Sequence, residues 1–153
     1  IFYSFFTSAL ENDEQKWIKN SLKNLLTTAT LLSVIVIIMI YIADIFYYYW
    51  IGDTVKVPFS LTVIIGILTI LQIYMRPLFM FINGSGKVKI QMYLGVLLAF
   101  INIPLSILFA VYFNLGVPGV LLATVATRMI ELIMYPIQVY RLVNKTAKGL
   151  WNE

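Results

Sequence analysis

The sequence contains no cysteine and no histidine among its 153 residues, and only 12% of them are charged. Without cysteine there is no disulfide and no thiol nucleophile, and without histidine there is no imidazole to bind a metal or to transfer protons. The charged fraction is about half of the roughly 25% that is usual in soluble domains. We therefore expect no enzymatic activity and no cofactor, and we do not expect a soluble domain.

Hydrophobic residues make up 61% of the chain, and the mean hydropathy is +0.89. A helix needs about 20 apolar residues to cross a hydrocarbon core of about 30 Å. The pattern predicts an all-α integral membrane protein with four transmembrane helices. The expected spans lie at about 25–50, 57–82, 90–113 and 117–143.

The segments outside these spans are short. Residues 1–10 are apolar but too short to cross a membrane, and the chain begins with Ile1, so we interpret them as the end of a helix that starts upstream in a longer polypeptide. Residues 11–24 place acids before lysines, which indicates a cytoplasmic link lying in the membrane interface or, alternatively, a solvated linker. Residues 144–153 are expected to form a cytoplasmic tail.

Nearly all basic residues outside the spans lie in the segments on one side of the membrane, and this asymmetry predicts the orientation of the chain. Short loops rich in lysine and arginine stay on the cytoplasmic side. The arrangement therefore predicts a multi-pass protein of the cell (inner) membrane with both ends of this segment cytoplasmic. It also explains the net charge of +4 without nucleic acid as a partner. The basic residues expected inside are Lys16, Lys19, Lys23, Lys87, Lys89, Arg141, Lys145 and Lys148, against Lys56 outside.

Charged and polar side chains within the spans are the candidate functional residues. A charge at a helix centre costs about 2.5–3.5 kcal/mol on insertion scales, so such residues usually face a bundle interior or a wet cavity. Asp44 follows the first span, where it is either an interfacial charge or an ion site. The candidate substrate-binding residues are Arg76, Arg128, Glu131, Gln72 and Asn102, with Thr124 at similar depth.

Two alternatives remain for the arginines. Arg128 and Glu131 are spaced i and i+3, so they share a helix face and either neutralise each other or provide an anion site that Glu131 tunes. Arg76 either lines a cationic cavity or extends to lipid phosphate at the membrane surface.

Several segments together resemble the C-terminal portion of O-antigen and related polysaccharide flippases. This family belongs to the superfamily that also contains multidrug and toxin exporters and the lipid II flippase. The segment before the first span, SFFTSALENDEQKWIK, is similar to the family's cytoplasmic link. The other segments are WIGD after an aromatic cluster, PLFMFINGSGKVKIQ, INIPLSILF, LGVPGVLLAT and PIQVYRLVNKTAKGLWN.

The resemblance implies that these are the last four helices of one lobe in a two-lobed transporter. It implies an undecaprenyl-pyrophosphate-linked oligosaccharide as the ligand, with membrane lipids and the upstream remainder of the polypeptide as partners. It assigns no role to Arg76 or Arg128. The alternatives are an ion-coupled multidrug exporter of the same superfamily, in which carboxylates should outnumber arginines at depth, and a non-transporting membrane scaffold subunit.

Overall fold

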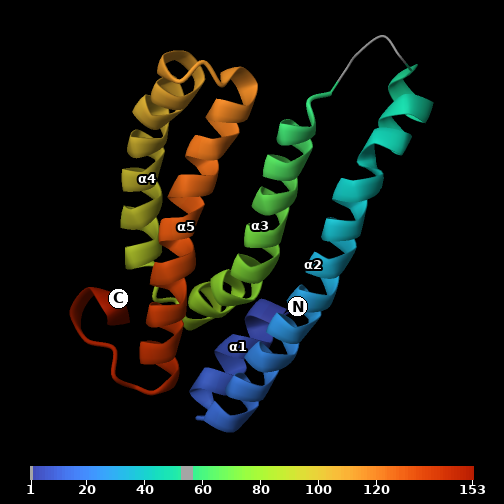
Figure 1. The fold of residues 1–153 in the computed structure, drawn as a ribbon. Coiled ribbons are helices and arrows are strands. Elements are labelled where there is room, and N and C mark those ends of the chain that lie inside the picture. Colours follow the sequence, from blue (N-terminus) through green and yellow to red (C-terminus); the bar gives the residue numbers. More distant parts are fainter. Residues whose placement is uncertain (1, 53–56) are drawn as a thin grey trace.

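The computed structural model describes residues 2–52 and 57–153, and the part that it describes is helical (Figure 1). Four of the helices are long and apolar enough to cross a membrane, which confirms the predicted number of spans and the all-α class. Lys56, the basic residue expected on the outer side, lies outside the described residues. The elements are α1 (Phe2–Glu11), α2 (Gln15–Ile51), α3 (Phe59–Ser85), α4 (Lys89–Ile107), a π-helix (Leu108–Tyr112), α5 (Gly116–Val143) and a 3₁₀-helix (Gly149–Asn152).

The first long helix differs from its expected form. Residues 15–24 are the first turns of α2 instead of a separate interfacial helix, and the link is reduced to the turn between Glu11 and Gln15. The physical reason is that no glycine or proline interrupts the 37 residues of α2. At about 1.5 Å per residue this helix is about 55 Å long, so it extends beyond a hydrocarbon core of about 30 Å.

Glycines shape the chain at the two ends of α4. Gly86 ends α3 with φ +69° and donates its backbone N–H to the carbonyl of Asn83 at 3.1 Å, a left-handed cap that glycine adopts without strain. At the other end, α4 continues through Pro104 into the π-helix, and α5 packs closely against that turn at Gly119. A Cβ at Gly119 would lie 2.7 Å from the backbone nitrogen of Ala110, so only glycine fits.

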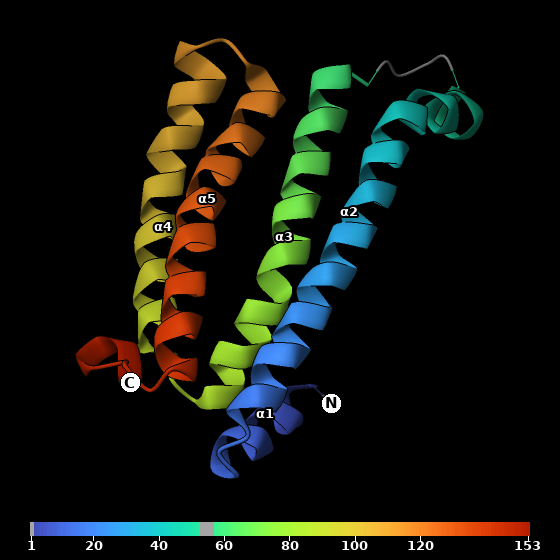
Figure 2. The ribbon, with the colours of Figure 1, turned by 60° about the horizontal axis from the view of Figure 1, so that its bottom comes forward.

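The long helices lie side by side in the order α4, α5, α3, α2 (Figures 1 and 2). α5 packs against both α3 and α4, while α3 and α4 do not contact each other over their described lengths. α1 lies across the end of α3 and the start of α2. Adjoining pockets lined by α3, α4 and α5 form a trough, with α5 as its floor and α3 and α4 as its two walls.

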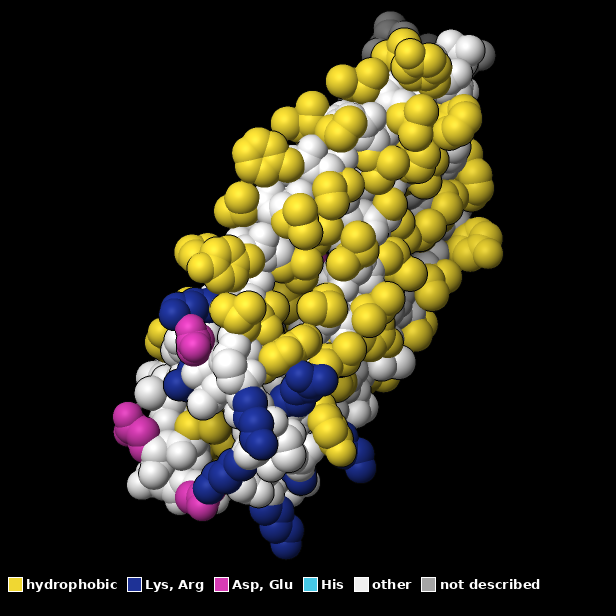
Figure 3. All heavy atoms as spheres, turned by 90° about the vertical axis from the view of Figure 1, so that its left-hand side faces the viewer, with side chains coloured by type: hydrophobic (Ala, Val, Ile, Leu, Met, Phe, Trp, Pro, Cys, Tyr) yellow, Lys and Arg dark blue, Asp and Glu magenta, His cyan; other side chains and the backbone are white. Residues whose placement is uncertain are grey.

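The packed core lies at the end where α2 begins and α3 and α5 finish. Phe6 of α1 is fully buried there, with its ring edge-on to Phe81 at 5.4 Å and to Trp17 at 5.9 Å between ring centroids. Basic side chains gather at the same end, and hydrophobic side chains cover the rest of the face that Figure 3 shows. Those exposed apolar helices are what a bilayer would cover.

The C-terminal residues fold back on this basic end. The backbone N–H of Lys89 donates to the carbonyl of Glu153 at 3.0 Å, and the Arg141 guanidinium lies 4.3 Å from the ring centroid of Trp151. Lys145 pairs with Asp13 at 2.7 Å and thereby joins the end of α5 to the turn before α2. This hydrogen bond and the charge of Lys145 lower the pKa of the exposed Asp13 carboxyl below 3.8.

Candidate functional site

A polar trough runs along the side of the bundle where α3 and α4 face each other across α5. It consists of three adjoining pockets of about 270, 440 and 350 Å³, and Arg128 lines all three. All five candidate residues from the sequence line at least one of them, so the structure brings the whole set together. The polar residues of the trough are Gln72, Arg76, Asn83, Gln91, Asn102, Thr124, Thr127, Arg128 and Glu131.

The α3 wall contributes Gln72 and Arg76, which are one turn apart and share a pocket with Arg128 of α5. Both α3 side chains are exposed. Within the described residues Arg76 has no ion pair and no hydrogen bond, so its charge is uncompensated. The two guanidinium groups therefore line one cavity from two different helices.

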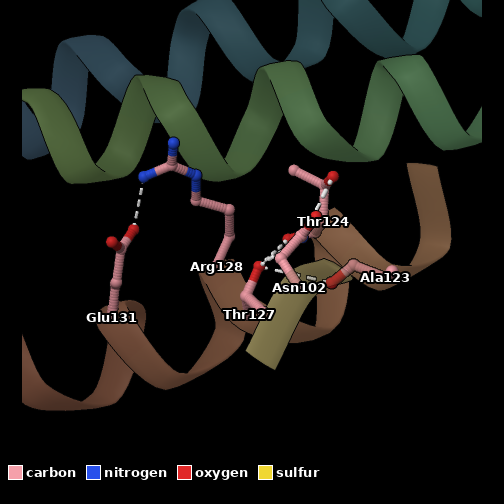
Figure 4. Close-up of polar contacts among 6 residues, drawn as sticks. All are labelled: Asn102, Ala123, Thr124, Thr127, Arg128 and Glu131. Carbon is pink, nitrogen blue, oxygen red and sulfur yellow. Dashed lines mark hydrogen bonds and ion pairs between the residues drawn. The ribbon is translucent and has the colours of Figure 1, made fainter. Parts of the chain in front are cut away.

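On the floor of the trough, Arg128 pairs with Glu131. The Arg128 Nη1 lies 2.6 Å from the Glu131 Oε2, the contact that the i, i+3 spacing allows. The arginine side chain is 43% exposed, whereas the glutamate side chain is only 7% exposed. Figure 4 shows the arginine extending from α5 toward α3, so its unpaired guanidinium edge remains directed into the trough.

Asn102 of α4 links the other wall of the trough to its floor, α5. Its side-chain amide donates to the Thr127 hydroxyl at 3.3 Å and to the Thr124 hydroxyl at 3.4 Å (Figure 4). Its side-chain carbonyl accepts from the Ser106 hydroxyl at 3.3 Å. Each of these contacts is at the long end of the hydrogen-bond range. Asn102 is thus placed in the trough as expected, but its polar atoms serve α4–α5 packing.

Gln91 is a trough residue that the sequence interpretation missed. Its side-chain Oε1 is buried and has no hydrogen-bond partner within the described structure, which is uncommon for a buried polar atom. Gln91 stands just inside α4, after the loop lysines, where the sequence pattern resembles an ordinary helix start. Only the approach of α5 to α4 reveals that Gln91 lines the same pocket as Asn83 and Arg128.

Comparison with known proteins gave no match, whether to a protein family, to a curated protein or to a solved structure. The chain has the helices of a multi-pass membrane protein, and on one side these helices enclose a polar trough with two arginines and one buried glutamate.

Proposed function

We propose that this chain is the C-terminal four-helix part of a flippase that moves an undecaprenyl-pyrophosphate-linked oligosaccharide across the cytoplasmic membrane. In this proposal the described helices belong to one lobe of a two-lobed transporter, and the upstream remainder of the polypeptide supplies the other helices. Both ends of the segment are cytoplasmic. The single observation that carries the proposal is that Arg76 and Arg128 line one cavity between two helices that are long and apolar enough to cross a membrane.

The charge of the trough supports an anionic ligand. Its charged residues are two arginines and one glutamate, which leaves a net charge of about +1 at a depth where Coulomb interactions are several times stronger than in water. A pyrophosphate would be attracted to the unpaired Arg76. A cationic drug would require the opposite balance, with more carboxylates than arginines.

The uncharged groups of the trough suit a sugar. The exposed amide of Gln72 offers a donor and an acceptor next to the arginines, and Asn83 and Gln91 line the adjoining pocket. The apolar tail of the lipid would remain in the bilayer. Prolines lie inside α3, α4 and α5 at positions 77, 104 and 136, where they would allow these helices to bend during alternating access.

A complementation experiment tests the proposal. A strain with the complete gene deleted is complemented with the wild-type gene, with Arg76→Gln, or with Lys148→Gln, which removes an exposed charge outside the trough. We expect the deletion to abolish surface polysaccharide, Arg76→Gln to lower it strongly at unchanged protein level, and Lys148→Gln to restore it fully. Normal polysaccharide in the deletion strain together with increased drug sensitivity would instead identify a multidrug exporter.

A further inference from the structure

A second cavity lies between α2, α3 and α5, on the other side of the bundle from the trough. α3 shows the separation directly, because it contributes Arg76 to the trough and Tyr74 to this second cavity. Tyr74 and Arg76 are two residues apart, and two residues of an α-helix correspond to a rotation of about 200°. The second cavity, which we call the basic groove, has a volume of about 850 Å³, within the range of roughly 300–1,000 Å³ that is usual for small-molecule sites.

The basic groove has a charged end. Lys19 and Lys23 line it from successive turns of α2, and no acidic residue lines it. Lys19 donates to the Asn144 side-chain carbonyl at 3.0 Å, whereas the described structure gives the Lys23 ammonium no ion pair. Like charges four residues apart on a helix repel each other. An anion bound between the two lysines would remove that repulsion.

The remainder of the basic groove is apolar. Leu22, Leu26 and Leu78 line it together with Val139 and Val143. The Thr27 and Thr30 hydroxyls donate to carbonyls of their own helix at 3.0 Å, so they present little unsatisfied polarity. From Lys19 to Thr30 the groove extends about 16 Å along α2, at about 1.5 Å per residue.

The position of the groove relative to a bilayer indicates its occupant. Its lysines are close to Asn144, the residue that caps α5, and Tyr140 lines the groove one turn earlier. Tyrosine is enriched at the headgroup level of membranes, and basic pockets between helices at that level bind anionic lipid headgroups. We propose that the basic groove binds an anionic glycerophospholipid, with its phosphate between Lys19 and Lys23 and one acyl chain along Leu26 and Val139.

Binding measurements on the complete polypeptide in detergent test this site. The probes are phosphatidylglycerol and phosphatidylcholine, titrated and followed by native mass spectrometry. Each lysine near a lipid surface strengthens binding about five-fold, so Lys19→Gln/Lys23→Gln should weaken phosphatidylglycerol binding about thirty-fold and leave phosphatidylcholine binding unchanged. The matched control, Lys16→Gln/Lys148→Gln, removes two exposed charges that do not line the groove and should have little effect.

A third variant tests the acyl-chain part of the proposal. Thr27 is exposed and lines the groove, so Thr27→Trp fills the groove without removing core contacts and should weaken phosphatidylglycerol binding about ten-fold or more. Equal weakening by the two lysine double variants would overturn the site in favour of diffuse surface charge. Wild-type affinity in Thr27→Trp, or equally tight binding of sn-glycerol 3-phosphate, would overturn the lipid as the occupant.

Discussion

The Arg128–Glu131 pair should respond unequally to loss of its two partners. Arg128→Gln leaves a carboxylate that is only 7% exposed without its cation, whereas Glu131→Gln leaves an arginine that is 43% exposed and can turn toward water or an anion. Breaking a fully buried pair costs about 3–5 kcal/mol. Because one partner here is half exposed, we discount that range and expect about 2 kcal/mol for Arg128→Gln and less than about 1 kcal/mol for Glu131→Gln.

A double-mutant cycle measures this asymmetry. The free energy of unfolding of the complete polypeptide is determined in mixed micelles for the wild type, both single variants and Arg128→Gln/Glu131→Gln. We expect the double variant to be nearly as stable as Glu131→Gln, with a coupling energy of about 1–2 kcal/mol. Equal losses in the two single variants, or a double variant at the sum of both, would refute the assignment of Glu131 as the desolvated partner.

Two further predictions concern other parts of the fold. Gly119→Ala should destabilise the α4–α5 hairpin by about 1–3 kcal/mol, because the new Cβ would meet backbone atoms at 2.7 Å, while Gly95→Ala, with nothing within 4 Å, should be neutral or slightly stabilising in the same unfolding assay. Lys145 lowers the pKa of the Asp13 carboxyl, so the ion pair should stabilise the fold fully above about pH 5 and progressively less as the pH falls through the folded-state pKa. Asp13→Asn should remove this contribution to the acid dependence of stability, as measured by thermal unfolding.

The helices were predictable from the sequence because each apolar run is long and is bounded by recognisable signals. Pro58 before α3 and Gly86 after it fix that helix at both ends. Residues 15–24 were interpreted as a link because of their lysines and asparagines, whereas the structure makes them the first turns of α2, since nothing in them breaks a helix. The charged residues showed that residues 15–24 lie outside the apolar span. They did not show that the same helix already includes these residues.

The sequence identified several polar residues that line the trough, though not Gln91, and it could not predict how they are arranged. The i, i+3 spacing was sufficient to predict the Arg128–Glu131 contact, since it depends on one helix alone. That Arg76 lies in the same cavity depends on how α3 packs against α5, which no local pattern specifies. The packing of α4 against α5 is equally non-local; it made Asn102 a structural contact and placed Gln91, with its buried unpaired carbonyl, in the lining of the trough.

Transport of lipid-linked oligosaccharide in vesicles tests the central claim most directly. The complete polypeptide is reconstituted as wild type, Arg76→Gln and Lys148→Gln, and the fraction of glycan that reaches the opposite leaflet is followed with a membrane-impermeant glycosidase. Loss of one charge-assisted hydrogen bond of about 1.5–3 kcal/mol predicts a rate about 10–150-fold lower for Arg76→Gln and an unchanged rate for Lys148→Gln. Equal flipping by the wild type and Arg76→Gln, or no flipping by the wild type, would contradict the claim that the trough carries an anionic lipid-linked glycan.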